Sequence, residues 1–108
     1  TFRNLLSEII GTFVLVFAIL GLSQVDGAGT VGVDKLLVFA IIVSIGMSLG
    51  GLTGYAINPA RDLGPRLAYA VLPFKNKADP NWGYSWIPVV GPILGGLLAV
   101  VIYNFIFI

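Results

Sequence analysis

Cysteine and histidine are absent from this chain of 108 residues, and charged side chains are scarce. Without cysteine there is no disulfide and no thiol nucleophile, and without histidine the commonest metal ligand and general base is missing. The formal net charge of +1, from six basic and five acidic residues, gives no electrostatic footprint for nucleic acid. We therefore expect no metal, no cofactor and no nucleic-acid partner, and these absences disfavour an enzyme.

Hydrophobic side chains dominate instead. They make up 57% of the residues, while charged residues make up 10%, against the ~25% usual for soluble domains. The mean hydropathy is +0.99. Because a soluble fold of this size has too little interior to hide so much apolar surface, the composition predicts a multi-pass protein of the cell membrane, in contact with the lipid bilayer.

Three apolar stretches are long enough to be transmembrane helices. They cover about residues 4–22, 36–52 and 85–108, and at ~1.5 Å per residue each of them crosses a hydrocarbon core of ~30 Å. Ser85 is the expected N-cap of the third span. Gly91-Pro92 is expected to bend that helix near its start.

The sequence between the second and third spans predicts a shorter helix over residues 58–71. At roughly 21 Å this helix cannot cross a ~30 Å core. Gly-rich residues 51–57, expected to be irregular, precede it, and polar residues 73–83 follow it. Irregular backbone at membrane depth survives only inside protein or beside an aqueous cavity. The pattern therefore favours a re-entrant half-helix whose positive N-terminal end faces the middle of the bilayer.

Glycines recur at a spacing of four residues. Gly46, Gly50 and Gly54 form one such series, and Gly91 and Gly95 another. This spacing is typical of helices whose backbones approach each other closely. The alternative is that such pairs arise by chance in a chain with 14 glycines.

The start of the short helix carries the functional signal. Asn58 is a preferred N-cap and Pro59 a preferred first helical residue, and Ala60 and Arg61 follow. The simplest interpretation is a well-capped helix. A charged arginine side chain inside a membrane segment costs free energy, however, and therefore faces a partner or a water-filled cavity. The carbonyls of residues 51–55, with no helix to satisfy them, can accept hydrogen bonds from a passing solute.

Residues 53–62, TGYAINPARD, resemble the second signature of the aquaporin superfamily, the major intrinsic proteins. Asp62 after Arg61 makes the segment similar to the glycerol uptake facilitator, or aquaglyceroporin, branch. The resemblance covers residues 1–108 as the C-terminal half of that fold, the second inverted repeat. It implies an all-α membrane protein with three transmembrane helices and one re-entrant half-helix. It also implies a missing first half, for reasons the sequence does not give, and a homotetramer for the complete protein.

The resemblance assigns pore roles to single residues. Asn58 resembles the asparagine, within Asn58-Pro59-Ala60, whose amide donates to the permeating hydroxyl, and Arg61 resembles the arginine of the selectivity filter. Tyr55 takes the place of a filter aromatic that is more often phenylalanine. Gly46 stands where water-selective members carry a bulky histidine, which implies an open side and a wider solute.

Four further residues mark the branch in this resemblance: Asp62, Arg66, Pro88 and Val89. The plainer explanation of the first two is an i,i+4 ion pair on one helix. Glu8 resembles a glutamate that accepts hydrogen bonds from the re-entrant loop, which would make it a structural support. Its alternative is a carboxylate that reaches back to the headgroups.

These features together predict a passive channel for glycerol, small polyols and some water that excludes ions and protons. One alternative is a secondary transporter built on a broken helix, with Glu8 as the only acidic candidate for a coupling-ion site. Another is a membrane fragment that does not conduct, because this half alone need not form a pore.

Overall fold

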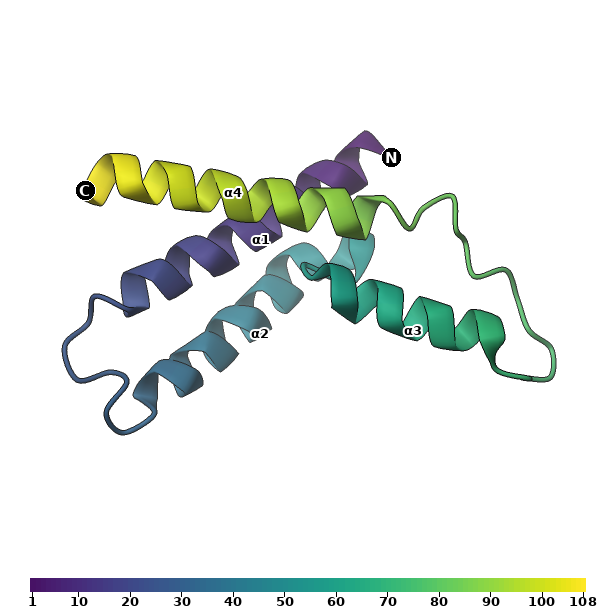
Figure 1. Cartoon of the computed structure of the whole chain (residues 1–108), viewed down its shortest axis with the longest axis horizontal. Coiled ribbons are helices and arrows are strands. Elements are labelled where there is room, and N and C mark those ends of the chain that lie inside the picture. The colour runs from purple at the N-terminus through teal and green to yellow at the C-terminus, as the bar shows by residue number, and fades with distance from the viewer.

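The computed structural model describes every residue from 1 to 108 and consists of four helices without a strand (Figure 1). The elements are α1 (Phe2–Leu22), α2 (Val33–Thr53), α3 (Pro59–Val71) and α4 (Ile87–Phe107). The predicted all-α fold, with three long helices and one short helix before the last, is confirmed.

The three long helices match the thickness of a membrane. Each of α1, α2 and α4 has 21 residues, with mean hydropathies of 2.4, 2.2 and 2.2 in their most apolar windows, and is about 31 Å long at the standard rise. Large apolar side chains such as Phe39 and Met47 on α2 are exposed. This pattern suits surfaces that face lipid or further protein, so the chain is a multi-pass membrane protein.

Helices α1 and α2 begin two and three residues earlier than expected, at Phe2 and Val33, and two further boundaries differ. Residues 51–53 are helical because α2 continues to Thr53, so the irregular stretch shrinks to residues 54–57. Ser85 is not the N-cap of α4. Its hydroxyl donates to the carbonyl of Trp82 at 2.7 Å, and the cap position falls on Trp86. Helix α4 runs through Gly91-Pro92 as one element.

Helices α1 and α4 pack closely through the predicted glycine pair. A Cβ at Gly91 would lie 2.7 Å from the Cβ of Glu8, and one at Gly95 would collide with the backbone oxygen of Ile9. Ala99, one turn further along α4, is completely buried. The small residues therefore let the two helices approach to backbone contact, and Figure 1 shows where α1 and α4 cross.

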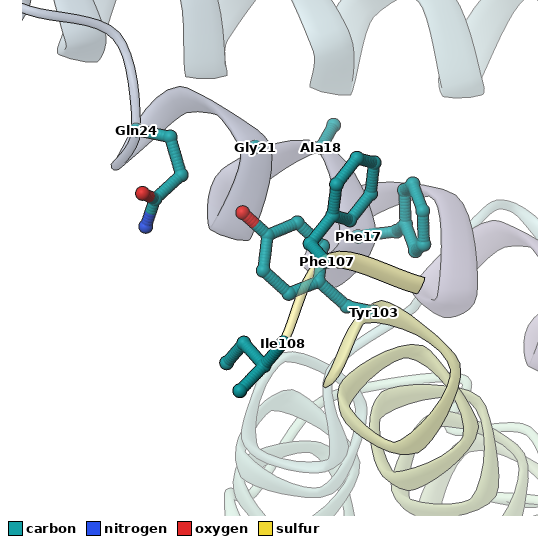
Figure 2. A pocket seen from close by; sticks show the side chains of 7 residues that line it. All are labelled: Phe17, Ala18, Gly21, Gln24, Tyr103, Phe107 and Ile108. Atoms are coloured by element: carbon teal, nitrogen blue, oxygen red, sulfur yellow. The ribbon is translucent and has the colours of Figure 1, made fainter. Parts of the chain in front are cut away.

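At the far end of this helix pair the packing is aromatic and looser. The rings of Phe17 and Tyr103 meet edge to face with centroids 5.5 Å apart. Beside them lies a pocket of about 620 Å³ (Figure 2). Its lining residues come from the ends of α1 and α4 and from the α1–α2 loop: Phe17, Ala18, Gly21, Gln24, Tyr103, Phe107 and Ile108. None of them belongs to the re-entrant segment.

Helix α3 is the predicted half-helix. Its 13 residues give roughly 20 Å, too short to cross the core. It packs against α4, and the segment after it loops back to α4 (Figure 1). The backbone that joins α2 to α3 therefore reverses direction inside the helix assembly.

A first prediction concerns the α1–α4 contact. Gly95→Ala should destabilise the fold by ~1–3 kcal/mol, because the added methyl meets backbone that cannot move aside. Gly96→Ala is the matched control, since its Cβ would lie at an ordinary 3.7 Å from Val16. Thermal unfolding of the purified protein in detergent measures both. Equal stability of the two variants would contradict the packing described here.

Candidate functional site

The connection between α2 and α3 is conformationally strained. Gly54 ends α2 with φ 73°, Tyr55 has φ 42° and Ile57 has φ 45°. Glycine tolerates a positive φ, whereas for a β-branched residue such as isoleucine it is a true outlier. A residue other than glycine in this conformation raises the free energy of the fold by about 1–3 kcal/mol. It persists only where the surrounding structure holds it in place.

Glu8 supplies that hold. Its side chain is completely buried, and its two carboxylate oxygens accept hydrogen bonds from the backbone N–H groups of Ala56 at 3.1 Å and Ile57 at 2.7 Å. Hydrogen bonds to an ionised acceptor are among the strong ones. This burial is incompatible with a carboxylate that reaches the headgroups, and the two hydrogen bonds make Glu8 a support for the loop.

Ile57 adds a second anchor to the same helix. Its Cγ2 would lie 3.0 Å from a Cβ at Gly11, so the absence of a side chain at Gly11 lets Ile57 approach α1. Ala56 and Ile57 are both buried. The loop is therefore fixed on α1 by two hydrogen bonds and one apolar contact.

Asn58 caps α3 in the predicted way. Its side-chain oxygen accepts from the backbone N–H groups of Ala60 at 2.9 Å and Arg61 at 3.3 Å, and Pro59 occupies the first helical position. Because the oxygen is committed to the helix, the amide NH₂ points away from it. That NH₂ group has no acceptor in the chain, and the residue is exposed.

Arg61 folds back over the loop. Its Nη1 donates to the carbonyl of Tyr55 at 2.6 Å and more weakly to that of Ala56 at 3.4 Å, and its Cζ lies 4.8 Å from the centroid of the Tyr55 ring. No carboxylate pairs with Arg61. The guanidinium is exposed, and its Nε and Nη2 groups keep their donors free.

A row of carbonyl acceptors precedes this arginine. The last bond of α2 runs from the Gly54 N–H to the Gly50 carbonyl at 2.9 Å, so the carbonyls of residues 51–54 have no partner in the chain. The sequence predicts an unpaired carbonyl at Tyr55 as well, and this is wrong because the Tyr55 carbonyl accepts from Arg61. Free acceptors and free donors thus follow one another along residues 51–61.

Gly46 does not leave the expected open space. A Cβ there would lie 2.9 Å from Cζ of Tyr55, so the tyrosine ring occupies the room that the missing side chain provides. The expectation that Gly46 leaves one side of the selectivity filter open is therefore corrected, because the Tyr55 ring fills that space. The ring could be placed here only once the backbone direction at Tyr55, with its φ of 42°, was known.

Asp62 and Arg66 form the expected ion pair at 2.9 Å, with two parallel hydrogen bonds of 3.0 Å. Arg66 does more than the sequence predicts, because its Nη1 also donates to the carbonyls of Pro80 and Asn81. Arg66 therefore fastens the segment before α4 to α3. Tyr84 lies in that segment, and burial raises the pKa of its hydroxyl above the ordinary 10.0.

A shallow polar depression lies beside these groups. Arg61, Asp62, Arg66 and Asp79 contribute to its lining. Pro88 and Val89, the other two branch-marking residues, do not line it. Pro88 is completely buried and Val89 is half-buried, so their place is in the packing of the first turns of α4.

Comparison with known proteins identifies the family. The family model described as "Major intrinsic protein" matches residues 1–103. The chain belongs to the major intrinsic protein family. The resemblance drawn from residues 53–62 is thereby confirmed, and the comparison with solved structures gave no significant match.

Similar proteins of this family carry the name glycerol uptake facilitator. The chain is 60% identical over 104 residues to the glycerol uptake facilitator protein of Bacillus subtilis, covering 96% of this chain and 37% of that protein. It is 54% identical over 103 residues to facilitator protein 3 of Lactiplantibacillus plantarum, covering 95% and 42%. It is 56% identical over 104 residues to a probable facilitator of Thermotoga maritima, covering 96% and 44%. The chain spans about two fifths of the length of these relatives.

A second prediction tests the role of Glu8 in this major intrinsic protein. Glu8→Gln keeps one acceptor oxygen but turns an NH₂ group toward the second backbone N–H, which loses its partner. We expect a loss of ~1–3 kcal/mol in the free energy of unfolding and faster hydrogen exchange at Ala56 or Ile57. Thermal unfolding in detergent and amide exchange by mass spectrometry measure these two effects.

The matched control for this prediction is Thr12→Val. Thr12 is also buried on α1, but its hydroxyl has no hydrogen-bond partner, so its removal should leave the loop protected. If Glu8→Gln matches the parent in stability and in exchange at both amides, Glu8 does not hold the loop.

Proposed function

We propose that this chain forms one part of the wall of a passive channel for glycerol and related small uncharged polyols, with some water. The observation that carries the proposal is the row of unpaired groups on the re-entrant segment. Free carbonyls at residues 51–54 lead to the free amide of Asn58 and the free donors of Arg61.

The chemistry of a polyol suits this row. Each hydroxyl both donates and accepts, so it can donate to a carbonyl of residues 51–54 while Asn58 or Arg61 donates to its oxygen. Replacing the hydration shell in this way is how narrow pores conduct a solute. The unpaired charge of Arg61 and the positive N-terminal end of α3 oppose the entry of cations and protons.

The relatives support glycerol as the permeant. Those from Bacillus subtilis and Lactiplantibacillus plantarum are both named glycerol uptake facilitators. Because the chain spans about two fifths of their length, we propose that it is the second inverted repeat of such a channel. The first inverted repeat of the complete protein then supplies the other part of the channel wall. The complete protein assembles as a homotetramer in the cell membrane.

The alternative of a membrane fragment that does not conduct applies to this chain by itself. Helix α3, at roughly 20 Å, cannot by itself line a path through a ~30 Å core. Conduction therefore needs the complete channel. Such a channel is made by exchanging the matched segment of the Bacillus subtilis relative for this sequence, and it is the protein used in the flux experiments below.

The transporter alternative is less well supported. It needs an acidic side chain free to bind a coupling ion near the middle of the membrane. Glu8 is the only acidic residue of α1, and both its oxygens are taken by backbone N–H groups. Asp34 lies in the first turn of α2 and α4 has no acidic residue. A glycerol flux that saturates and follows an ion gradient would nevertheless favour the transporter.

A third prediction concerns Arg61. Lysine keeps the charge but loses the planar fork of donors, so Arg61→Lys should lower glycerol flux and keep protons out. Arg61→Ala should weaken the exclusion of protons, although the N-terminal end of α3 retains part of it. Light scattering measures glycerol flux in proteoliposomes, and a trapped pH dye measures proton leak.

Arg3 provides the matched controls. It is exposed at the start of α1, so Arg3→Lys and Arg3→Ala should leave both fluxes unchanged. If Arg61→Ala folds, inserts and shows the parent's glycerol flux and proton leak, Arg61 does not face the solute. The proposed channel wall would then be wrong.

A further inference from the structure

Two glycines of α2 form a flat shelf under the ring of Tyr55. Gly46 and Gly50 are four residues apart and so share one face of the helix. A Cβ at Gly46 would lie 2.9 to 3.2 Å from three atoms at the hydroxyl end of the ring, and one at Gly50 would lie 2.8 Å from Cδ1. Distances under 3.0 Å are not tolerated by real Cβ atoms. The ring therefore rests directly on the helix backbone.

Arg61 is bound to the same tyrosine. Its guanidinium carbon lies 4.8 Å from the ring centroid, within the range of a cation–π contact, and its Nη1 donates to the Tyr55 carbonyl. The place of the guanidinium is thus set by Tyr55, and the place of the ring is set by the glycine shelf. A shift of the ring would carry Arg61 with it.

The Tyr55 ring can adjust less to an added side chain at Gly50 than to one at Gly46. Cδ1 is next to the carbon that joins the ring to Cβ, so it cannot swing away without moving the whole side chain. The backbone of Tyr55 already has a φ of 42°, and the next two N–H groups are held by Glu8. A methyl group at Gly50 must therefore push the ring off α2.

We propose that Gly50 is a positioning residue that determines specificity in the channel. It contacts no solute; it lets the Tyr55 ring lie against α2 and so holds the ring and Arg61 at the wall of the path, where Arg61 can donate to a polyol. This inference rests on the proposed function. A side chain at position 50 would displace Tyr55 and Arg61 and so narrow the selectivity filter. The flux of glycerol would then fall more than the flux of water, because glycerol is the wider solute.

Gly50→Ala in the complete channel tests this inference, with Gly21→Ala as the matched control. Gly21 lies in the last turn of α1, and a Cβ there would meet nothing within 4 Å. We expect Gly50→Ala to lower glycerol flux about tenfold, equivalent to ~1.4 kcal/mol of barrier and within the range of overpacking effects. Water flux on the same vesicles should fall much less, and Gly21→Ala should change neither flux.

A double variant separates positioning from general damage. In a Tyr55→Ala background the ring is gone, so adding Gly50→Ala should cause no further change in either flux. If Gly50→Ala alone fails to reach the membrane, removal of the ring in the double variant should restore its membrane level. A double variant that still fails would overturn the inference.

Two further results distinguish its failure from that of the proposed function. If the unmodified complete channel conducts glycerol and Gly50→Ala conducts it equally well, Gly50 has no positioning role and the channel stands. If the unmodified complete channel shows no glycerol flux, the proposed function is wrong, and this inference is overturned with it.

Discussion

The whole re-entrant segment depends on one carboxylate. Glu8 lies fully buried on α1 and accepts the backbone N–H groups of Ala56 and Ile57. Without it the positive φ angles at Tyr55 and Ile57 would have no compensation in a medium that offers no water to unpaired N–H groups. With it, the chain can leave α2, leave the carbonyls of residues 51–54 unpaired and begin α3 at Pro59, capped by Asn58.

Glycine sets the distances around that carboxylate. Gly91 lets α4 approach α1 at the Cβ of Glu8, and Gly11 lets Ile57 approach α1 from the loop side. Gly46 and Gly50 do the same for the ring of Tyr55 on α2. The same residue type thus serves the packing of α1 against α4 and the close approach of the re-entrant segment to α1 and α2. The four-residue spacing alone could not distinguish these two uses.

The parts that could be predicted from the sequence are those that local physics decides. The apolar lengths of α1 and α4 and the cap formed by Asn58 and Pro59 follow from span length and from helix-start preferences. The end of α2 differs from the sequence prediction, because glycines at positions 50, 51 and 54 are typical of irregular backbone. In a membrane, however, backbone groups favour internal pairing, and the helix therefore continues to Thr53.

The parts that could not be predicted depend on contacts between distant residues. Gly46 gave no sign that the ring of Tyr55 would fill its place, because the direction of that ring follows from a backbone angle rarely adopted by tyrosine. Arg66 suggested a helix-surface pair with Asp62, whereas its bonds to Pro80 and Asn81 join residues 14 and 15 positions apart. Only the folded chain brings these groups together.

An experimental structure of the complete channel with glycerol bound would test the central claim most directly. The account predicts glycerol hydroxyls within hydrogen-bonding distance of the carbonyls of residues 51–54 and of the free donors of Asn58 and Arg61. It also predicts that Glu8 still accepts the N–H groups of Ala56 and Ile57. Glycerol that passes elsewhere in the protein, or a loop released from Glu8 while glycerol is bound, would contradict the account.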